Sequence, residues 1–475
     1  MSTPAAVDAP SVEVSAEDVA NLVRSKGFHA WRQRVESVAG CARPIQLHGS
    51  STLTDTTTGQ RVGGTAGLLF VACGNRRASV CQPCSERYAA DTFHLIRSGM
   101  VGGKDVPATV ASHVRVFTTL TAPSFGQVHN QPRTRAGKPR PCACGEWHHD
   151  ADPRLGAALD PAAYDYVGAV LWQNHAPELW RRFTIACARH LAHALGVSAT
   201  ALKQLARVSY AKVAEYQRRG LVHFHAVVRV DGPDGPGSLP PVEVTAELLS
   251  SVIRTAASSI TLTSPECDAT GTRDLVWGSQ VDTAPIAPER ATADPGALAE
   301  EHGKTDSSVA GYIAKYATKG TGASAGTDRP IRSAAEIETL PISEHHKTMM
   351  ATAWWLGGLP EFSGLLLRKW AHMLGFRGHF LTKSRRYSVT FTSLRDARKA
   401  HQLAASLAEL GITDTDRITV TGEWVLAGIG YRSAAEREFA GVLAESVRTR
   451  RAMRGGRDPD ESDQSTPDDN HTEGF

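Results

Sequence analysis

The strongest structural signal in the chain is residues 208–230, VSYAKVAEYQRRGLVHFHAVVRV. Its two halves, 208–217 and 221–230, are rich in β-branched and aromatic residues, which predicts two strands. The three residues between them, RRG at 218–220, place a glycine where a hairpin loop needs a left-handed residue. The segment therefore predicts an antiparallel β-hairpin.

Two histidines and one glutamate are expected on one face of this hairpin. Because side chains alternate along a strand, His223 and His225 point to the same side. The loop length places Glu215 opposite His223, and Gln217, which has the same parity, is the alternative third ligand. Two imidazoles and a carboxylate suit a labile Mg²⁺ or Mn²⁺ that acts on phosphate oxygens. The alternative is a half-buried strand with two hydrogen-bonded histidines.

A helix expected over residues 309–319 carries two phenols and two ammonium groups on one side. At 100° per residue they fall within an arc of about 100°, and they are Tyr312, Lys315, Tyr316 and Lys319. Small apolar residues occupy the opposite side, which can pack on a sheet. A phenol is a nucleophile once ionised, and a nearby ammonium favours the phenolate, so this face suits phosphoryl transfer. The alternative is an amphipathic helix with its polar side in water.

Four cysteines provide the number of thiolates that a structural Zn²⁺ requires, and they are Cys41, Cys73, Cys81 and Cys84. A redox Cys-x-x-Cys is less favoured because no thioredoxin-like βαβ pattern surrounds it. A later cluster of Cys142, Cys144 and His148 leaves open whether a second zinc site exists.

The segment 374–387 interleaves cations with aromatic residues, as expected for a surface that contacts single-stranded or hairpin DNA. The predicted DNA-binding residues are Arg377, Lys383, Arg385, Arg386 and Tyr387. The alternative is a basic strand at the edge of a C-terminal domain.

Length and composition limit the class of protein. The 475 residues are 41% hydrophobic, enough for real cores, and 52 basic residues against 49 acidic ones give a net charge of +3. This balance excludes a uniformly cationic DNA binder but allows local basic patches. No apolar run reaches the roughly 18 residues of a membrane span, and the N-terminus lacks the pattern of a signal peptide. We therefore expect a cytoplasmic protein without a membrane partner.

The pattern along the chain predicts an α+β protein in five parts. These are a flexible N-terminus and helix (1–40), a zinc-binding module (41–105), a catalytic domain with insertions (106–325), a C-terminal α/β DNA-binding region (340–450) and a disordered tail (451–475).

Three motifs occur in the order found in HUH endonucleases. They are a strand with Thr119 and Thr121, the Glu-x-Gln-x-Arg-Gly-x-x-His-Phe-His hairpin, and the helix Tyr-Ile-Ala-Lys-Tyr-Ala-Thr-Lys. The tyrosine spacing resembles the two-tyrosine branch. Together with segment 374–387, it makes the chain similar to rolling-circle replication initiators of actinobacterial plasmids and integrative elements.

The resemblance implies a palm-like antiparallel β-sheet flanked by helices and a metal-dependent nick at a double-strand origin. The cut leaves a 5′-phosphotyrosine and a free 3′-OH, and the strand is later rejoined. By motif position, His223 and His225 are implied as metal ligands and Tyr316 and Tyr312 as nucleophiles. Tyr316 is favoured for the first cut, although both tyrosines fit the motif.

The partners implied are origin DNA and host DNA polymerase. A host helicase is also expected, because the chain shows no ATP-binding signature. Two other classes remain open at this point. One is a transposase or conjugative relaxase with the same chemistry, and the other is a non-enzymatic, zinc-dependent DNA-binding regulator.

Overall fold

The computed structural model describes residues 14–134, 136–287, 304–318, 329–409 and 411–454. Its contacts divide the chain into two compact units. Unit 1 combines residues up to 88 with those from 392 onward, and unit 2 comprises residues 89–391. Both units mix helices with antiparallel sheets, which confirms the predicted α+β class.

Unit 2 is built on a six-stranded sheet with the order β10-β4-β5-β3-β8-β9. The strands are β3 (Arg115–Leu120), β4 (Arg207–Tyr216), β5 (Val222–Asp231), β8 (Val281–Ala287), β9 (Lys304–Thr305) and β10 (Leu381–Lys383). All neighbours are antiparallel except β8 and β9, which run parallel. The four strands from β4 to β8 give the sheet its continuous, hydrogen-bonded centre.

The predicted hairpin forms the middle of this sheet. β4 and β5 pair in the expected register, with Glu215 opposite His223. The loop closes through a hydrogen bond from the Gln217 amide to the Leu221 carbonyl, and Gly220 has a φ of 76°. Residue 220 adopts the left-handed conformation that glycine tolerates best, so the sequence pattern identified the turn correctly.

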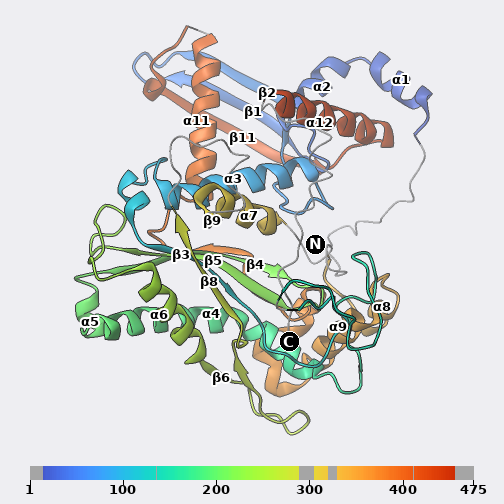
Figure 1. The fold of residues 1–475 in the computed structure, drawn as a ribbon. Helices are drawn as coiled ribbons and strands as arrows, with labels where there is room; N and C mark the ends of the chain where they lie inside the picture. Colours follow the sequence, from blue (N-terminus) through green and yellow to red (C-terminus); the bar gives the residue numbers. More distant parts are fainter. Residues whose placement is uncertain (1–13, 135, 288–303, 319–328, 410, 455–475) are drawn as a thin grey trace. The chain divides into compact units, whose positions relative to one another are not determined.

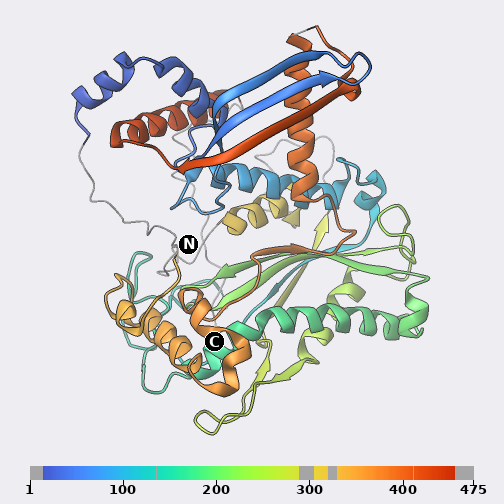
Figure 2. The same ribbon diagram turned by 180° about the vertical axis from the view of Figure 1, so that it is seen from behind.

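Helices cover both faces of the sheet (Figure 1; Figure 2). On one face lie α4 (Tyr166–Ala194) and α6 (Ala246–Ser258), and α7 (Asp306–Thr318) lies on the other. Trp180 of α4 packs edge-on against Phe224 of β5, with ring centroids 5.7 Å apart. Because β5 is covered from both sides, nearly all of its residues are buried.

Unit 2 also contains several further helices and a small two-stranded ribbon. The helices include α5 (Ala199–Leu202), α8 (Ala334–Glu338), α9 (Glu344–Leu356) and α10 (Leu367–Trp370), and the ribbon is formed by β6 (Thr261–Thr263) and β7 (Asp274–Val276).

Unit 1 has its own antiparallel sheet with the order β11-β1-β2. Its strands are β1 (Ile45–Asp55), β2 (Arg61–Val71) and β11 (Ile418–Ile429). Its helices are α1 (Ala16–Arg24), α2 (Phe28–Ser37) and α12 (Ala434–Arg454). It also contains the start of α3 (Gln82–Val101) and nearly all of α11 (Phe391–Glu409). A small core joins Phe28 and Trp31 of α2 to Phe439 of α12.

Several expectations differ from this arrangement. The single helix expected within residues 1–40 is instead two helices, α1 and α2, which are separated near Gly27, where φ is 93°. The strands β8 and β11 were not predicted. The two compact units also differ from the predicted domains. Strand β11, near the C-terminus, pairs with β1, near the N-terminus, so unit 1 contains both ends of the described chain.

Parts of the expected flexible ends lie outside the described residues. These parts are residues 1–13 of the N-terminal segment and residues 455–475 of the tail. The helix α12 ends at Arg454, inside the segment 451–475 that was expected to be disordered.

Lys212 of β4 is buried on the sheet face that α4 covers. Its ammonium lies 4.0 Å from the centroid of the Phe224 ring, and its Nζ donates a hydrogen bond of 3.3 Å to the His379 carbonyl. Burial lowers the pKa of Lys212 to about 7, because removing the charge from water is costly. The charge at this position is therefore tolerated rather than stabilising.

Replacing Lys212 by Met should stabilise the protein at pH 7 and flatten its pH dependence. Because the folded pKa lies below the unfolded value, the unfolded chain binds more protons. Stability in the wild type therefore falls as the pH drops from about 10 to about 7, by up to about 1.4 kcal/mol per pH unit. Urea denaturation at several pH values measures this slope. The exposed Lys203→Met is the control, and an unchanged slope in Lys212→Met contradicts the prediction.

Candidate functional site

The hairpin brings three predicted ligand atoms together on the sheet face that α7 covers. Oε2 of Glu215 lies 3.2 Å from Nε2 of His223 and 3.1 Å from Nε2 of His225, and the two Nε2 atoms are 3.2 Å apart. Such a triangle of nitrogen and oxygen atoms can hold one metal ion.

The electrostatics of this group favour a cation. Although burial raises the pKa of Glu215, hydrogen bonds with His223 and His225 lower it to about 2, so the carboxylate is ionised. Two unprotonated Nε2 atoms cannot hydrogen-bond to each other, so their approach requires a shared proton or a metal ion. The donor set of two nitrogens and one carboxylate therefore suits a metal cation.

Thr119 of β3 fixes the orientation of one imidazole. Its Oγ1 lies 3.0 Å from Nδ1 of His225. When Nδ1 carries the proton and donates it to this hydroxyl, the lone pair of Nε2 points at the cluster, as in many metal sites. The alternative ligand Gln217 is engaged elsewhere, because its Oε1 accepts a hydrogen bond of 2.9 Å from Nε of Arg219.

Tyr312 of α7 reaches the same cluster. Its hydroxyl oxygen lies 3.4 Å from Nε2 of His225, and the two rings meet edge-to-face with centroids 5.0 Å apart. Phe117 of β3 contacts both rings, stacking on His225 and meeting Tyr312 edge-on. A phenol thus lies beside the candidate metal ligands, held by aromatic packing.

The rest of the tyrosine helix is described in part. Ala310, Ile313 and Ala314 are buried, which confirms the apolar side predicted from the helical period. The backbone of Tyr316 continues α7 one turn after Tyr312, but its side chain is not described. Lys315 is exposed on α7, and Lys319 lies outside the described residues.

A buried ion pair that the sequence analysis missed attaches α7 to the sheet. Asp306, the first residue of α7, accepts hydrogen bonds of 3.0 and 2.9 Å from Nε and Nη2 of Arg115 in β3. Both side chains are only 1% exposed. Arg115 also donates to the Val110 and Ala111 carbonyls. This pair fixes the N-terminus of the helix that carries Tyr312.

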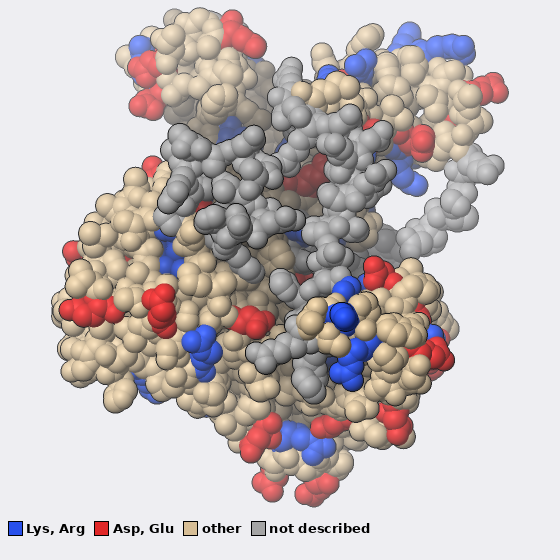
Figure 3. Space-filling model, in the orientation of Figure 1, with Lys and Arg blue, Asp and Glu red and all other residues tan. Residues whose placement is uncertain are grey.

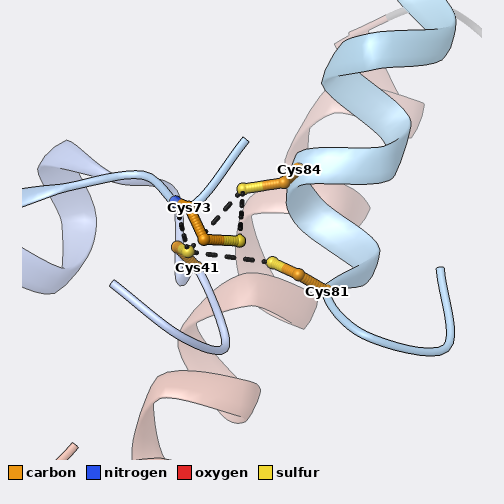
Figure 4. Close-up of side chains that lie close together, drawn as sticks. All are labelled: Cys41, Cys73, Cys81 and Cys84. Atoms are coloured by element: carbon orange, nitrogen blue, oxygen red, sulfur yellow. Dashed lines mark hydrogen bonds between the residues drawn. The ribbon is translucent and has the colours of Figure 1, made fainter. Parts of the chain in front are cut away.

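The four predicted zinc ligands converge in unit 1 (Figure 4). Sγ of Cys41 lies 3.8 Å from that of Cys81 and 3.6 Å from that of Cys84, and Cys73 lies 3.7 Å from Cys84. Sulfurs bound to one tetrahedral zinc at about 2.3 Å are about 3.8 Å apart. The cluster therefore has the dimensions of a Cys₄ metal site.

Hydrogen bonds within the cluster show that its thiols do not act independently. The bond between Cys81 and Cys41 raises the pKa of Cys41 and lowers that of Cys81. The Cys73 and Ala42 amides donate bonds of 3.3 Å to sulfurs of the cluster. The two amide contacts stabilise thiolate character, which a bound cation requires.

Three of the predicted DNA-binding side chains are exposed, namely Arg377, Arg385 and Arg386. Lys383 of β10 is half-buried, and its Nζ donates a hydrogen bond of 2.7 Å to the Ser388 carbonyl. β10 pairs with β4 as an edge strand of the unit 2 sheet. The three arginines are therefore more exposed to solvent than Lys383.

The aromatic part of that prediction is wrong for Tyr387. This residue is fully buried, its hydroxyl donates a hydrogen bond of 3.2 Å to the Ile96 carbonyl, and the Arg229 guanidinium lies over its ring. Phe376 and Phe380 are buried too. None of these rings is exposed for stacking on a DNA base, because the core of unit 2 uses them.

The surface of the described residues shows no single basic face in the view of Figure 3. Lys and Arg side chains are interspersed with Asp and Glu, in keeping with the small net charge of +3. Within the part of the chain that the structure describes, no helix is long and apolar enough to cross a membrane.

Comparisons with known proteins agree on one class. Residues 27–445 match the family model RepSA, described as the replication initiator protein of pSAM2. A replication initiator protein of Streptomyces ambofaciens is 41% identical over 446 residues, which are 91% of this chain and 94% of that protein. No solved structure matches the chain.

Replacing Glu215 by Ala should weaken Mn²⁺ binding by at least the roughly 10- to 100-fold that loss of an outer-shell partner costs. Gln217→Ala is the matched control and should leave the affinity nearly unchanged. Electron paramagnetic resonance of free Mn²⁺ during titration measures both. If binding is lost in Gln217→Ala and retained in Glu215→Ala, the third ligand is Gln217.

Replacing Asp306 by Asn should loosen α7, because removing one partner of a buried ion pair costs about 3–5 kcal/mol. Hydrogen exchange of the α7 amides should accelerate strongly. Asp396→Asn removes one partner of an exposed pair with Lys399 and should cost less than about 1 kcal/mol. Equal effects of the two substitutions would show that the buried pair does not hold the helix.

Proposed function

The chain belongs to the RepSA family of replication initiator proteins, and we propose that it starts rolling-circle replication by nicking one strand of a plasmid-type origin. One observation carries the proposal. The Tyr312 hydroxyl oxygen lies 3.4 Å from Nε2 of His225, within a cluster of two imidazoles and the Glu215 carboxylate. The phenol of the proposed nucleophile thus lies directly beside the candidate metal site.

The proposed chemistry is a transesterification. A Mg²⁺ or Mn²⁺ ion held by Glu215, His223 and His225 would polarise the scissile phosphate as a Lewis acid. The phenol oxygen of Tyr312 attacks phosphorus and loses its proton, while the bond from phosphorus to O3′ breaks. The electron pair leaves with O3′, which takes up a proton. The products are a 5′-phosphotyrosine and a free 3′-OH.

Tyr316 is proposed as the second nucleophile of the same helix. The HUH-type motif favours Tyr316 for the first cut, whereas the contact with His225 supports Tyr312. One tyrosine would open the origin and the other would take part in the later strand transfer that rejoins the DNA. Lys315 and Lys319 are proposed to favour the phenolate and to stabilise negative charge on the phosphate.

Origin DNA, in a single-stranded or hairpin form at the nick site, is the proposed substrate. Arg377, Arg385 and Arg386 are proposed to contact its phosphates, and such binding weakens steeply with added salt. The free 3′-OH would prime a host DNA polymerase, and a host helicase would unwind the duplex. The four-cysteine cluster is proposed to hold a structural Zn²⁺.

Replacing both tyrosines by Phe should abolish cutting of origin oligonucleotides in the presence of Mn²⁺, because no phenol remains to attack. A 3′-labelled oligonucleotide should become covalently attached to the wild-type protein, and a 5′-labelled one should yield a shorter product that a polymerase extends. Tyr312→Phe and Tyr316→Phe, tested singly, identify the first nucleophile.

Tyr210→Phe is the control, because Tyr210 packs against Trp180 on the other face of the sheet. It should cut like the wild type. Cutting by the double variant at the wild-type rate would exclude the tyrosine mechanism. DNA binding without any cutting by the wild type would instead support a regulator.

A further inference from the structure

A second group of metal-ligand side chains lies in the segment 121–165, which connects β3 to α4 in unit 2. Nδ1 of His129 lies 3.2 Å from Nε2 of His148, and Sγ of Cys144 lies 3.3 Å from the same nitrogen. With Cys142, their ligand atoms all lie within 4.8 Å of one another. Ligands of one tetrahedral zinc are separated by about 3.3–3.8 Å, so the spacing fits.

The surroundings of His148 match those of a zinc-bound histidine. Its Nδ1 lies 2.7 Å from Oδ2 of Asp152, and its side chain is fully buried. When Nδ1–H donates to this carboxylate, Nε2 presents its lone pair to the two cysteines and His129. Asp152 is itself held by Arg154 through its backbone amide and its guanidinium.

The surroundings of Cys142 also suit a metal ligand. It is buried, and its sulfur accepts hydrogen bonds from the Cys144 and Asn130 backbone amides. The chain turns directly after Cys144, with a bond from the Gly145 amide to the Cys142 carbonyl and a φ of 90° at Gly145. Amide-to-sulfur bonds around a tight turn stabilise a thiolate, the form that binds zinc.

We propose that His129, Cys142, Cys144 and His148 bind a second structural zinc ion, separate from the four-cysteine cluster of unit 1. The described part of segment 121–165 contains no helix or strand. A connection of this length without secondary structure is uncommon in a compact domain. The zinc would supply the cross-link that a hydrophobic core does not.

The contacts of segment 121–165 indicate what a bound zinc ion would stabilise. The Arg218 guanidinium donates a hydrogen bond of 2.8 Å to the Asp150 carbonyl, and a Cβ at Gly156 would overlap the Arg218 backbone. Arg219 donates to the Ala122 and Pro123 carbonyls. The segment therefore packs on the loop of the β4–β5 hairpin, next to the strand that carries His223.

Zinc content of the purified full-length chain tests the proposal without any DNA reaction, so its outcome is independent of the proposed nicking. The count is repeated in a Glu215→Ala background, which removes one candidate ligand of the Glu215–His223–His225 cluster so that zinc bound there does not enter the total. We expect two zinc ions per chain in the wild type and one in Cys142→Ser. Cys267→Ser, which changes a buried thiol outside both clusters, should retain two.

If Cys142→Ser fails to fold, X-ray absorption at the zinc edge of the wild type identifies the ligand atoms instead. Two sites, one with four sulfurs and one with two sulfurs and two nitrogens, give a mean of three sulfurs and one nitrogen per zinc. A single zinc per wild-type chain with four sulfur ligands would overturn the proposal. So would an equal zinc content in the wild type and a folded Cys142→Ser.

Discussion

The antiparallel pairing of β4 with β5 is the constraint on which the candidate site depends. It sets Glu215 opposite His223 and turns His225 to the same face. A slip of one residue would turn both imidazoles toward the face that α4 and α6 cover. Gly220 protects the register, because it takes a left-handed conformation where a Cβ would collide with the Met349 side chain. A backbone feature thus determines whether the ligand atoms converge.

The second requirement is that a helix remote in sequence docks on this face in one position. The buried side chains of Ala310, Ile313 and Ala314 hold α7 in the core, but apolar burial alone does not define its position along the sheet. The bidentate contact between Arg115 and Asp306 does, since its two hydrogen bonds have fixed geometry. Such a buried pair contributes little net stability, so its value here is the placement of Tyr312.

Both cysteine-containing clusters join parts of the chain that are separated in sequence. In unit 1 the cysteines join the end of α2, the end of β2 and the start of α3. In unit 2 the group around His148 joins distant parts of a segment without regular structure. A zinc ion bound at such a place contributes folding free energy directly, which side chains in irregular loops cannot supply by packing alone.

Patterns in the sequence were sufficient for the hairpin, for the shared face of Glu215, His223 and His225, for the apolar side of α7 and for the four-cysteine group. The first three depend on a period of two or 3.6 residues, which local geometry translates into a shared face, and the last on the number of thiolates that a structural zinc ion requires. Only the tertiary structure decided five other features. These are the pairing of β11 with β1, the addition of β8 to the sheet, the contact of Arg115 with Asp306, the position of His129 beside His148 and the burial of Tyr387. They join segments that are far apart in sequence, and a local pattern specifies which side of an element is apolar but not which distant segment will cover it.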